Sequence, residues 1–214
     1  MSTIENPTER EKDINNLGRF ITKFLRHELK NYIQKIKITE DGFIKVSDLL
    51  SLDKKTRSKK PLNEYTPEDV IIAVEKDNKN RMTYKIIDGI LMIRANQGYS
   101  FSEGFNPEKI YKKITNTNQL PIPGLAIHGT SKKYISAIIK NGLNPMKRTH
   151  IHFSTQEYGS SEMISGMRKS SEVLIYLDVE KVLNNNIPLY LSENQVLLCP
   201  EIIPREYFKD IRYI

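Results

Sequence analysis

Cysteine is almost absent from this sequence: Cys199 is the only one among 214 residues. A lone cysteine cannot form a disulfide within the chain, and it excludes a zinc site built on CxxC pairs. No apolar run approaches the ~20 residues that a helix needs to cross a bilayer, which excludes a membrane span. The first twelve residues are polar and mixed in charge, unlike a secretory signal. We therefore expect a cytoplasmic protein.

Three common nucleotide-binding and hydrolase motifs are missing too. Neither GxGxxG nor GxxxxGKS/T occurs, which argues against a Rossmann dinucleotide site and against a P-loop. The GxSxG turn of serine hydrolases is also absent.

The composition that remains is ordinary, except for its charge. Hydrophobic residues make up 38% and charged residues 28% of the chain, which is typical of a soluble globular protein with one large or two small domains. Lys and Arg number 33 against 26 Asp and Glu, a net charge of +7. A basic surface favours polyanionic partners such as RNA, DNA or phosphorylated ligands, although a lysine-rich soluble surface gives the same balance.

The first half of the chain has the pattern of helices followed by a hairpin. Apolar residues spaced three and four apart predict a helix over 13–32, and Arg19, Lys23, Arg26 and Lys30 form a basic stripe on its other face. Ser47 predicts the cap of a short helix over 48–52, and Thr66-Pro67 predicts the start of a helix that runs to about Asp77. The remaining features are a basic loop expected to be mobile at 54–60 and a hairpin of strands 81–87 and 90–94 around Asp88-Gly89. This order indicates a winged helix.

The second half is rich in predicted strands. Residues 103–119 are polar and indicate a connection between two lobes. Strands are expected at 125–128, 151–154, 173–178, 188–191 and 195–198, with a helix over 135–141 that ends at Gly142 in the left-handed conformation. We therefore expect an α+β protein with lobes at 1–102 and 120–214, joined by 103–119.

Several polar clusters are candidate sites. Arg26-His27 can bind a phosphate and donate a proton, but it can also be a solvated helix face. In a strand, Arg148, His150, His152 and Ser154 would share one face, which indicates either a cleft or an exposed sheet surface. The two histidines could hold a metal only with His128 as third ligand, and without HExxH or CxxC we expect no metal.

Three further segments can be functional or merely structural. His128-Gly129-Thr130 follows an apolar strand and either contacts a ligand or caps the next helix. The polar run from Arg94 to Ser100 either binds phosphate or ribose or simply ends the hairpin. Arg81, at the start of the hairpin, is either a site residue or solvated.

Taken together and in order, these segments resemble the NAD-dependent RNA 2′-phosphotransferase family over about residues 13–208. The family's motifs match Leu25-Arg26-His27, Asp41-Gly42-Phe43 with Leu49-Leu50, Lys79–Met82, Arg94–Ser100, His128–Thr130, Arg148–Ser154, Gly166–Arg168 and Ser192–Val196. Three positions depart from the family: Tyr99 replaces a histidine, Met82 a phenylalanine and Gln195 a glycine. The first departure puts an ionisable role at Tyr99 in doubt, and the last affects a turn beside the expected NAD pocket.

The resemblance implies a winged-helix-like RNA-binding lobe followed by a β-rich, ADP-ribosyltransferase-like lobe that binds NAD. Its triad of two histidines and an apolar residue would be His128, His152 and Val196. The implied NAD-binding set is His128, Gly129, Thr130, His152, Ser154, Gly166, Arg168, Ser192, Asn194 and Val196. The implied RNA contacts are Arg19, Lys23, Lys30, Arg94, Asn96, Gln97, Tyr99 and Ser100.

The implied reaction moves an internal RNA 2′-phosphate to NAD in two steps and yields 2′-hydroxyl RNA, nicotinamide and ADP-ribose 1″,2″-cyclic phosphate. Arg26, His27, Arg81 and Arg148 would form the catalytic tetrad, which can converge only between the two lobes. The resemblance implies a tRNA-like substrate, tRNA splicing as the setting, no metal and a monomer. Two alternatives stay open: a winged-helix nucleic-acid-binding protein without catalysis, and an ADP-ribosyltransferase that modifies nucleic-acid terminal phosphates or proteins.

Overall fold

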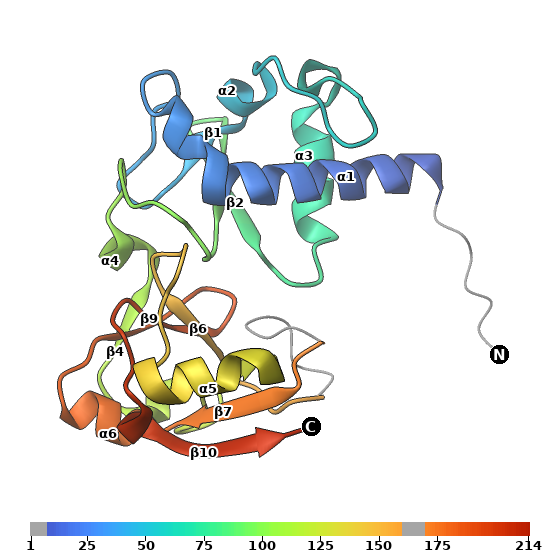
Figure 1. Ribbon diagram of the computed structural model, residues 1–214. Coiled ribbons are helices and arrows are strands. Elements are labelled where there is room, and N and C mark those ends of the chain that lie inside the picture. Colours follow the sequence, from blue (N-terminus) through green and yellow to red (C-terminus); the bar gives the residue numbers. More distant parts are fainter. Residues whose placement is uncertain (1–7, 160–169) are drawn as a thin grey trace. The chain divides into compact units, whose positions relative to one another are not determined.

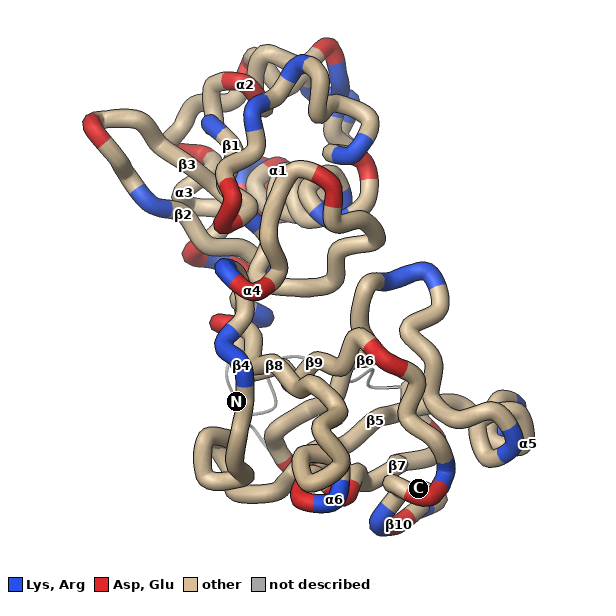
Figure 2. The backbone as a smooth tube through the Cα atoms, turned by 90° about the vertical axis from the view of Figure 1, so that its left-hand side faces the viewer, with Lys and Arg blue, Asp and Glu red and all other residues tan. Residues whose placement is uncertain are grey.

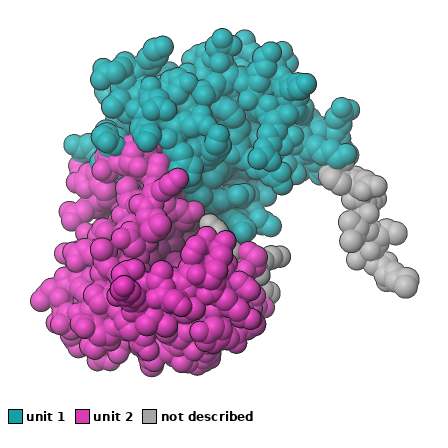
Figure 3. Space-filling view, in the orientation of Figure 1, with its two compact units in different colours: residues 1–95, 103–105 teal, residues 96–102, 106–214 magenta. Residues whose placement is uncertain are grey.

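The computed structural model describes residues 8–159 and 170–214, which form two compact units. Unit 1 comprises Met1–Ala95 with Glu103–Phe105, and unit 2 comprises Asn96–Ser102 with Asn106–Ile214 (Figures 1 and 3). The two units follow the order of the expected lobes, but residues 96–102 and 106–119 pack with the second unit. The protein is a mixed helix and sheet structure with antiparallel sheets.

The first helix starts earlier and ends sooner than its apolar pattern predicts. Helix α1 covers Glu9–Lys23, because Thr8 and Glu11 form a reciprocal capping box that starts it ahead of Asp13. The chain then continues as a π-helical turn, Phe24–Glu28, and a 3-10 turn, Leu29–Tyr32. The expected single helix over 13–32 is therefore three helical segments with different geometry.

Short helices complete the helical part of unit 1. Helix α2 covers Val46–Leu50 and begins after Lys45, so the expected Ser47 cap is wrong. The helix begins one residue before Ser47, at Val46, whose side chain is buried in the core. Helix α3 covers Pro67–Glu75, and the capping box of Thr66 and Asp69 confirms the predicted start. A 3-10 turn at Leu62–Glu64 precedes it.

The hairpin of unit 1 is confirmed. Strands β2 (Met82–Ile87) and β3 (Ile90–Ala95) pair antiparallel from Met82–Ala95 to Ile87–Ile90. Asp88 and Gly89 both have positive φ, which is what the tightest hairpin turn requires. The two-residue strand β1 (Ile44–Lys45) adds to β3, and the sheet order is β1-β3-β2.

Unit 2 is built on a seven-stranded antiparallel sheet in the order β10-β7-β5-β6-β9-β8-β4. Its strands are β4 (Lys112–Ile114), β5 (Ile127–Thr130), β6 (Ile151–Ser154), β7 (Val173–Leu177), β8 (Leu189–Leu191), β9 (Val196–Cys199) and β10 (Phe208–Tyr213). Its helices are α4 (Pro107–Ile110), α5 (Lys132–Asn141) and α6 (Val179–Asn184), with 3-10 turns at Thr117–Gln119 and Arg205–Tyr207. The segment expected to be a connection thus contains a short helix, α4, and an edge strand, β4.

Helix α5 ends at Gly142, but not in the expected left-handed conformation. Gly142 has φ +80° and ψ 173°, a backbone conformation open almost only to glycine. A Cβ at this position would lie 2.6 Å from the carbonyl oxygen of Ile203. The glycine lets the next residue, Leu143, exchange two backbone hydrogen bonds with Ile203.

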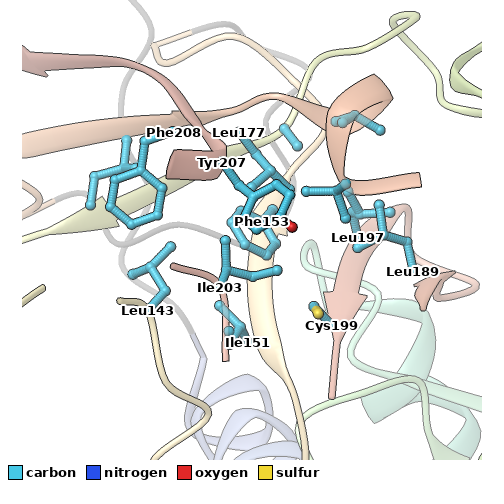
Figure 4. Packing of buried hydrophobic residues seen from close by; sticks show 14 of the residues in the cluster. Leu143, Ile151, Phe153, Leu177, Leu189, Leu197, Cys199, Ile203, Tyr207 and Phe208 are labelled. Atoms are coloured by element: carbon cyan, nitrogen blue, oxygen red, sulfur yellow. The ribbon is translucent and has the colours of Figure 1, made fainter. Parts of the chain in front are cut away.

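The core of unit 2 lies on one face of this sheet (Figure 4). Phe153 on β6 and Leu197 on β9 are fully buried there and are directly paired across the two strands. Side chains alternate along a strand, so the residues on either side of these two point to the opposite face. That opposite face carries the polar residues His152 and Ser154 of β6. Among residues 8–159 and 170–214, no helix is long and apolar enough to cross a membrane.

Candidate active site

Arg26 and His27 lie in the π-helical turn that follows α1. The amide of Leu29 donates to the carbonyl oxygen of Phe24, five residues back, which closes the wider turn. Phe24 and Leu25 are fully buried, whereas Arg26 and His27 are half-buried on the other side of the turn. Such π turns occur often at functional sites, because they re-aim side chains that a regular helix would fix.

The π turn breaks the predicted basic stripe. Steps of four, three and four residues give one face only in a regular α-helix. Arg19 and Lys23 lie on α1, but Arg26 falls in the π turn and Lys30 in the 3-10 turn, so the four residues do not form one continuous α-helical face. The expectation that the four residues lie on one regular helix is therefore wrong.

Glu28 anchors the end of the π turn with two ion pairs. Its carboxylate lies 2.8 Å from Nζ of Lys23 and 3.0 Å from Nζ of Lys54. The hydrogen bond from Lys23 is the largest influence on the pKa of Glu28, and with the Lys54 contact it outweighs burial and lowers that pKa. Lys23, predicted to contact RNA, and Lys54, from the basic loop, thus both hold the segment that carries Arg26 and His27.

Arg81 is held by a carboxylate that belongs to none of the motifs. The Asp77 side chain accepts from Nε and Nη2 of Arg81, the latter at 2.6 Å, and from the Arg81 amide, also at 2.6 Å. Asp77 is 3% exposed and the Arg81 side chain 32% exposed. Arg81 is therefore neither solvated nor buried. The one sequence signal was an aspartate four residues before the arginine, just beyond a helix end.

Arg94 has a structural partner within unit 1. Its Nη1 donates to the carbonyl oxygen of Asp41 at 2.9 Å, and its guanidinium stacks 4.8 Å from the Phe43 ring centroid. Lys85 completes the arrangement by pairing with the Asp41 carboxylate at 2.6 Å. Arg94 thus fastens the Asp41-Gly42-Phe43 turn to β3.

The segment after β3 is buried in unit 2. Asn96, Gln97 and Tyr99 are each less than 5% exposed, and Ser100 is half-buried. The Tyr99 ring packs edge-on against Phe101 at 5.9 Å. The backbone carbonyl oxygen of Tyr99 accepts hydrogen bonds from the amide and the hydroxyl of Thr149, which fixes this segment to the start of the Arg148–Ser154 motif.

The Arg148–Ser154 motif is only partly a strand. Arg148 lies in an exposed turn and β6 begins at Ile151, so the expected four-residue polar face is wrong at its start. His150 is buried against the rings of Tyr111 and Tyr190 and contacts the Thr149 hydroxyl. Burial lowers the pKa of His150 to about 4. His150 therefore packs against these rings in its neutral form at neutral pH.

The members of the expected triad lie on three adjacent strands, and the register pairs His128 with Ile175, a residue of the core cluster. Ser154 on β6 is paired with Val196 on β9, and His152 lies two residues along on the same face. On β5, Nδ1 of His128 lies 3.0 Å from the carbonyl oxygen of His152, and its ring contacts Phe153 edge-on. This contact places the proton on Nδ1 and leaves Nε2 as an acceptor in the neutral ring. His152 and Ser154 are buried, so this part of the motif is not an exposed sheet surface.

A tight turn between β8 and β9 lies beside these strands. Ser192 Oγ accepts from the Val196 amide at 3.0 Å and lies 2.9 Å from Oδ1 of Asn194. Gln195 has φ +60°, the left-handed conformation for which the related family uses glycine. The Thr155 hydroxyl donates to the Gln195 carbonyl oxygen at 2.6 Å and ties the turn to the end of β6. The substitution therefore keeps the turn.

Gly129 and Thr130 are strand residues rather than the expected loop or cap. Both belong to β5, where they pair with Leu174 and Val173 of β7. Gly166 and Arg168, predicted to contact NAD, lie outside the described residues. Within 8–159 and 170–214, no group of three or more His, Cys, Asp or Glu side chains is arranged to hold a metal ion.

Sequence comparison connects this arrangement to a family. The family model described as RNA 2′-phosphotransferase, Tpt1 / KptA family, matches residues 11–201, so the chain belongs to this family. The tRNA 2′-phosphotransferase 1 of Danio rerio is 32% identical over 91% of this chain and 81% of its own length. The human protein of the same name is 30% identical over 95% of this chain and 77% of its own length.

A protein of Schizosaccharomyces pombe is 35% identical over 96% of this chain. The match covers 54% of that relative, so the chain spans about half of its length.

Proposed function

We propose that this protein is an NAD-dependent RNA 2′-phosphotransferase. The observation that carries the proposal is the family match, which runs through both units and includes every polar cluster described above. Both relatives are named tRNA 2′-phosphotransferase 1, so the proposed substrate of this protein is tRNA or a tRNA-like RNA. In this proposal unit 1 is the winged-helix-like RNA-binding part, and unit 2 is the ADP-ribosyltransferase-like part that binds NAD.

The polar face of the unit 2 sheet supports NAD as co-substrate. His152, Ser154 and the turn residues Ser192 and Asn194 supply buried hydrogen-bonding groups of the kind that ribose hydroxyls and an amide need. Val196, which is paired with Ser154 across β6 and β9, adds an apolar residue to this face. A glutamate in the position of Val196 would activate a neutral attacking hydroxyl, but a phosphate nucleophile is already charged and needs no such base.

The proposed reaction has two balanced steps. In the first, an oxygen of the RNA 2′-phosphate bonds to C1″ of the nicotinamide ribose, and the C1″–N bond breaks to release nicotinamide. In the second, O2″ of the same ribose loses its proton and bonds to phosphorus, and the bond from phosphorus to the RNA 2′-oxygen breaks. The RNA oxygen takes up a proton, and ADP-ribose 1″,2″-cyclic phosphate is released.

In this proposal the tetrad stabilises the negative charge that develops on the phosphate oxygens in the transition state. Arg26 and Arg81 of unit 1 and Arg148 of unit 2 are fixed cations suited to phosphate oxygens, and they make a metal unnecessary. His27 is the proposed proton donor to the leaving RNA 2′-oxygen.

The test is incubation with an oligoribonucleotide that carries one internal 2′-phosphate, with and without NAD. The expected result is 2′-hydroxyl RNA, nicotinamide and the cyclic phosphate, all dependent on NAD. A stable ADP-ribosyl adduct on RNA ends or protein would instead identify an ADP-ribosyltransferase. RNA binding without nicotinamide release would identify a nucleic-acid-binding protein without catalysis. Either of these outcomes would contradict the proposal.

A further inference from the structure

The carboxylate of Asp77 is bound mainly by Arg81. It accepts hydrogen bonds from Nε of Arg81 at 3.0 and 3.2 Å, from Nη2 at 2.6 Å and from the Arg81 amide at 2.6 Å, and the Lys79 amide donates to it at 3.4 Å. We propose that Asp77 is a positioning residue, which fixes the Arg81 guanidinium in the orientation that binds the transferred phosphate. This inference rests on the proposed function, and it adds a residue that none of the family motifs above includes.

The backbone between the two residues is shaped to make this contact. Asp77 follows the end of α3, and its amide donates to the carbonyl oxygen of Val74. The Asn80 amide then donates to the carbonyl oxygen of Asp77 at 2.8 Å, and Asn80 has φ +43°. This tight turn reverses the chain, so the guanidinium of Arg81 returns to the carboxylate just before β2 begins.

Electrostatics keep the pair ionised. Burial is the largest single influence on the pKa of Asp77 and raises it, but the hydrogen bonds and charge of Arg81 outweigh it and leave the pKa below its usual range. At neutral pH a negative, nearly buried carboxylate therefore faces the arginine. A buried charge without its partner is costly, so this contact strongly limits the orientations open to Arg81.

The remaining donors of Arg81 have the right geometry for a phosphate. Asp77 occupies Nε and one N–H of Nη2, so both N–H groups of Nη1 and the second of Nη2 point away from it. One N–H of Nη1 and the second N–H of Nη2 form one edge of the planar guanidinium, and such an edge binds two phosphate oxygens at once. The 32% exposure of the Arg81 side chain, against 3% for Asp77, agrees with one occupied edge and one accessible edge.

The competing interpretation is an ion pair that stabilises unit 1 and does nothing for catalysis. The two interpretations differ in which quantity changes when Asp77 is altered. A structural pair affects unfolding and leaves the turnover of the folded protein unchanged. A positioning residue affects the step in which charge develops on phosphorus, and only while Arg81 is present.

The experiment is a double-mutant cycle in the full chain with D77N, R81A and the double variant. D77N keeps the volume of the side chain but removes its charge, and D77A is run alongside. Single-turnover rates are measured on the 2′-phosphorylated oligoribonucleotide at saturating NAD, at a temperature where circular dichroism shows each variant folded. E75A is the matched control, because Glu75 lies on the same helix end and contacts Tyr84 of β2 through a side-chain hydrogen bond.

We expect D77N and D77A to slow the second chemical step, which frees the RNA 2′-oxygen, by about 10- to 100-fold, because a misplaced catalytic group can cost that much. The 2′-phospho-ADP-ribosylated RNA should accumulate, while the rate of nicotinamide release changes less. In the R81A background, D77N should have little further effect, and E75A should react like the unmodified protein. In NMR spectra, the Arg81 Nε–H should exchange slowly with water and lose this protection in D77N.

Two results would overturn the inference. One is that folded D77N and D77A react as fast as the unmodified protein. The other is that the fold-reductions in rate caused by D77N and by R81A multiply in the double variant. Either result leaves the proposed function intact, provided that the unmodified protein makes the cyclic phosphate. An unmodified protein that releases no nicotinamide from NAD and RNA would instead reject the proposed function and this inference together.

Discussion

The hydroxyl of Thr22 lies 3.3 Å from the sulfur of Met82, in a buried contact between the last turns of α1 and the first residue of β2. Thr22 precedes the π turn and Met82 follows Arg81 directly. This contact therefore joins the end of the helix that leads to Arg26 and His27 to the start of the strand that follows Arg81. A phenylalanine, the residue that the related family has here, could not accept this hydrogen bond.

The size of Met82 should matter more than its sulfur. Met82 is 3% exposed, so Met82→Ala should lower the free energy of unfolding of unit 1 by about 2–5 kcal/mol, the range for truncating a buried side chain. Met82→Leu keeps the volume and should cost less than about 1.5 kcal/mol. Thr22 keeps its bond to the Gly18 carbonyl oxygen at 2.8 Å in both variants. Urea unfolding measures the difference, and equal costs would contradict the packing argument.

The left-handed backbone at Gln195 predicts a stabilising substitution. A side chain at φ +60° costs roughly 1–2 kcal/mol that glycine avoids, so Gln195→Gly should raise the free energy of unfolding by ~1 kcal/mol. The bond from the Thr155 hydroxyl to the residue 195 carbonyl oxygen is retained, because it uses only backbone at 195. Asn186→Gly is the control, since asparagine tolerates its φ of +58° and should gain less. Loss of stability in Gln195→Gly would show that the side chain itself supports the turn.

His150 predicts a loss of stability in mild acid. Its pKa is about 4 in the folded protein and near 6.5 when unfolded, so between these values only the unfolded chain gains the proton. The free energy of unfolding should therefore fall as the pH drops from about 6.5 to about 4, by at most ~3 kcal/mol from this residue. Urea unfolding of the protein and of His150→Gln at pH 7.5 and 4.5 measures the effect. A pH dependence equal in both proteins would contradict it.

Arg81→Ala should slow the second chemical step more than the first. Phosphorus carries the greater developing charge in the second step, and removing one group that binds such charge costs on the order of 10²-fold or more. The measurement is accumulation of 2′-phospho-ADP-ribosylated RNA relative to nicotinamide. Lys85→Ala is the matched control from the same hairpin, because Lys85 pairs with the Asp41 carboxylate and its removal should lower stability instead. Unmodified turnover in folded Arg81→Ala would reject its catalytic role.

Local sequence signals predicted the elements that local chemistry specifies. Thr66-Pro67 starts α3 through a cap, and Asp88-Gly89 closes the hairpin through its backbone preference. Strand β4 was missed because Lys112–Ile114 is too short to show a pattern, and it is a strand through its pairing with β8. Strand β10, six residues of mixed polarity, was missed as well, although five of its residues pair with β7.

The same distinction applies to the candidate site. Motif order predicts Arg26, His27 and His152 as site residues, because residue type and sequence carry that information. The π turn and the Asp77–Arg81 pair depend on hydrogen bonds that no motif records. His150 shows the converse, since this histidine, two residues after Arg148 in the same motif, packs against tyrosine rings.

The basic loop after α2 should contact the RNA backbone more strongly than the helix surface does. Lys and Arg line the chain beyond α2 (Figure 2), and Lys55, Arg57 and Lys59 are exposed. The loop that presents them has its own bracing. Buried Thr56 lies 3.1 Å from the Tyr65 hydroxyl and 2.9 Å from the Ser58 hydroxyl. Lys23, in contrast, is already paired with Glu28.

Charge reversal tests whether the loop contacts RNA more strongly than the helix surface does. Reversing Lys55, Arg57 and Lys59 to glutamate should weaken RNA binding and reduce the slope of log affinity against log salt by about 0.7 for each phosphate that the protein no longer neutralises. Reversing Arg19 and Lys30 on the helical segments should reduce the slope less. The control is reversal of Lys132, Lys133 and Lys140 on α5, which changes the net charge of the protein by the same amount as the loop variant. If the α5 variant lowers the slope as much as the loop variant, the effect is one of total charge. RNA contact at the loop would then be rejected, because a contact acts only through the phosphates within reach of those three side chains.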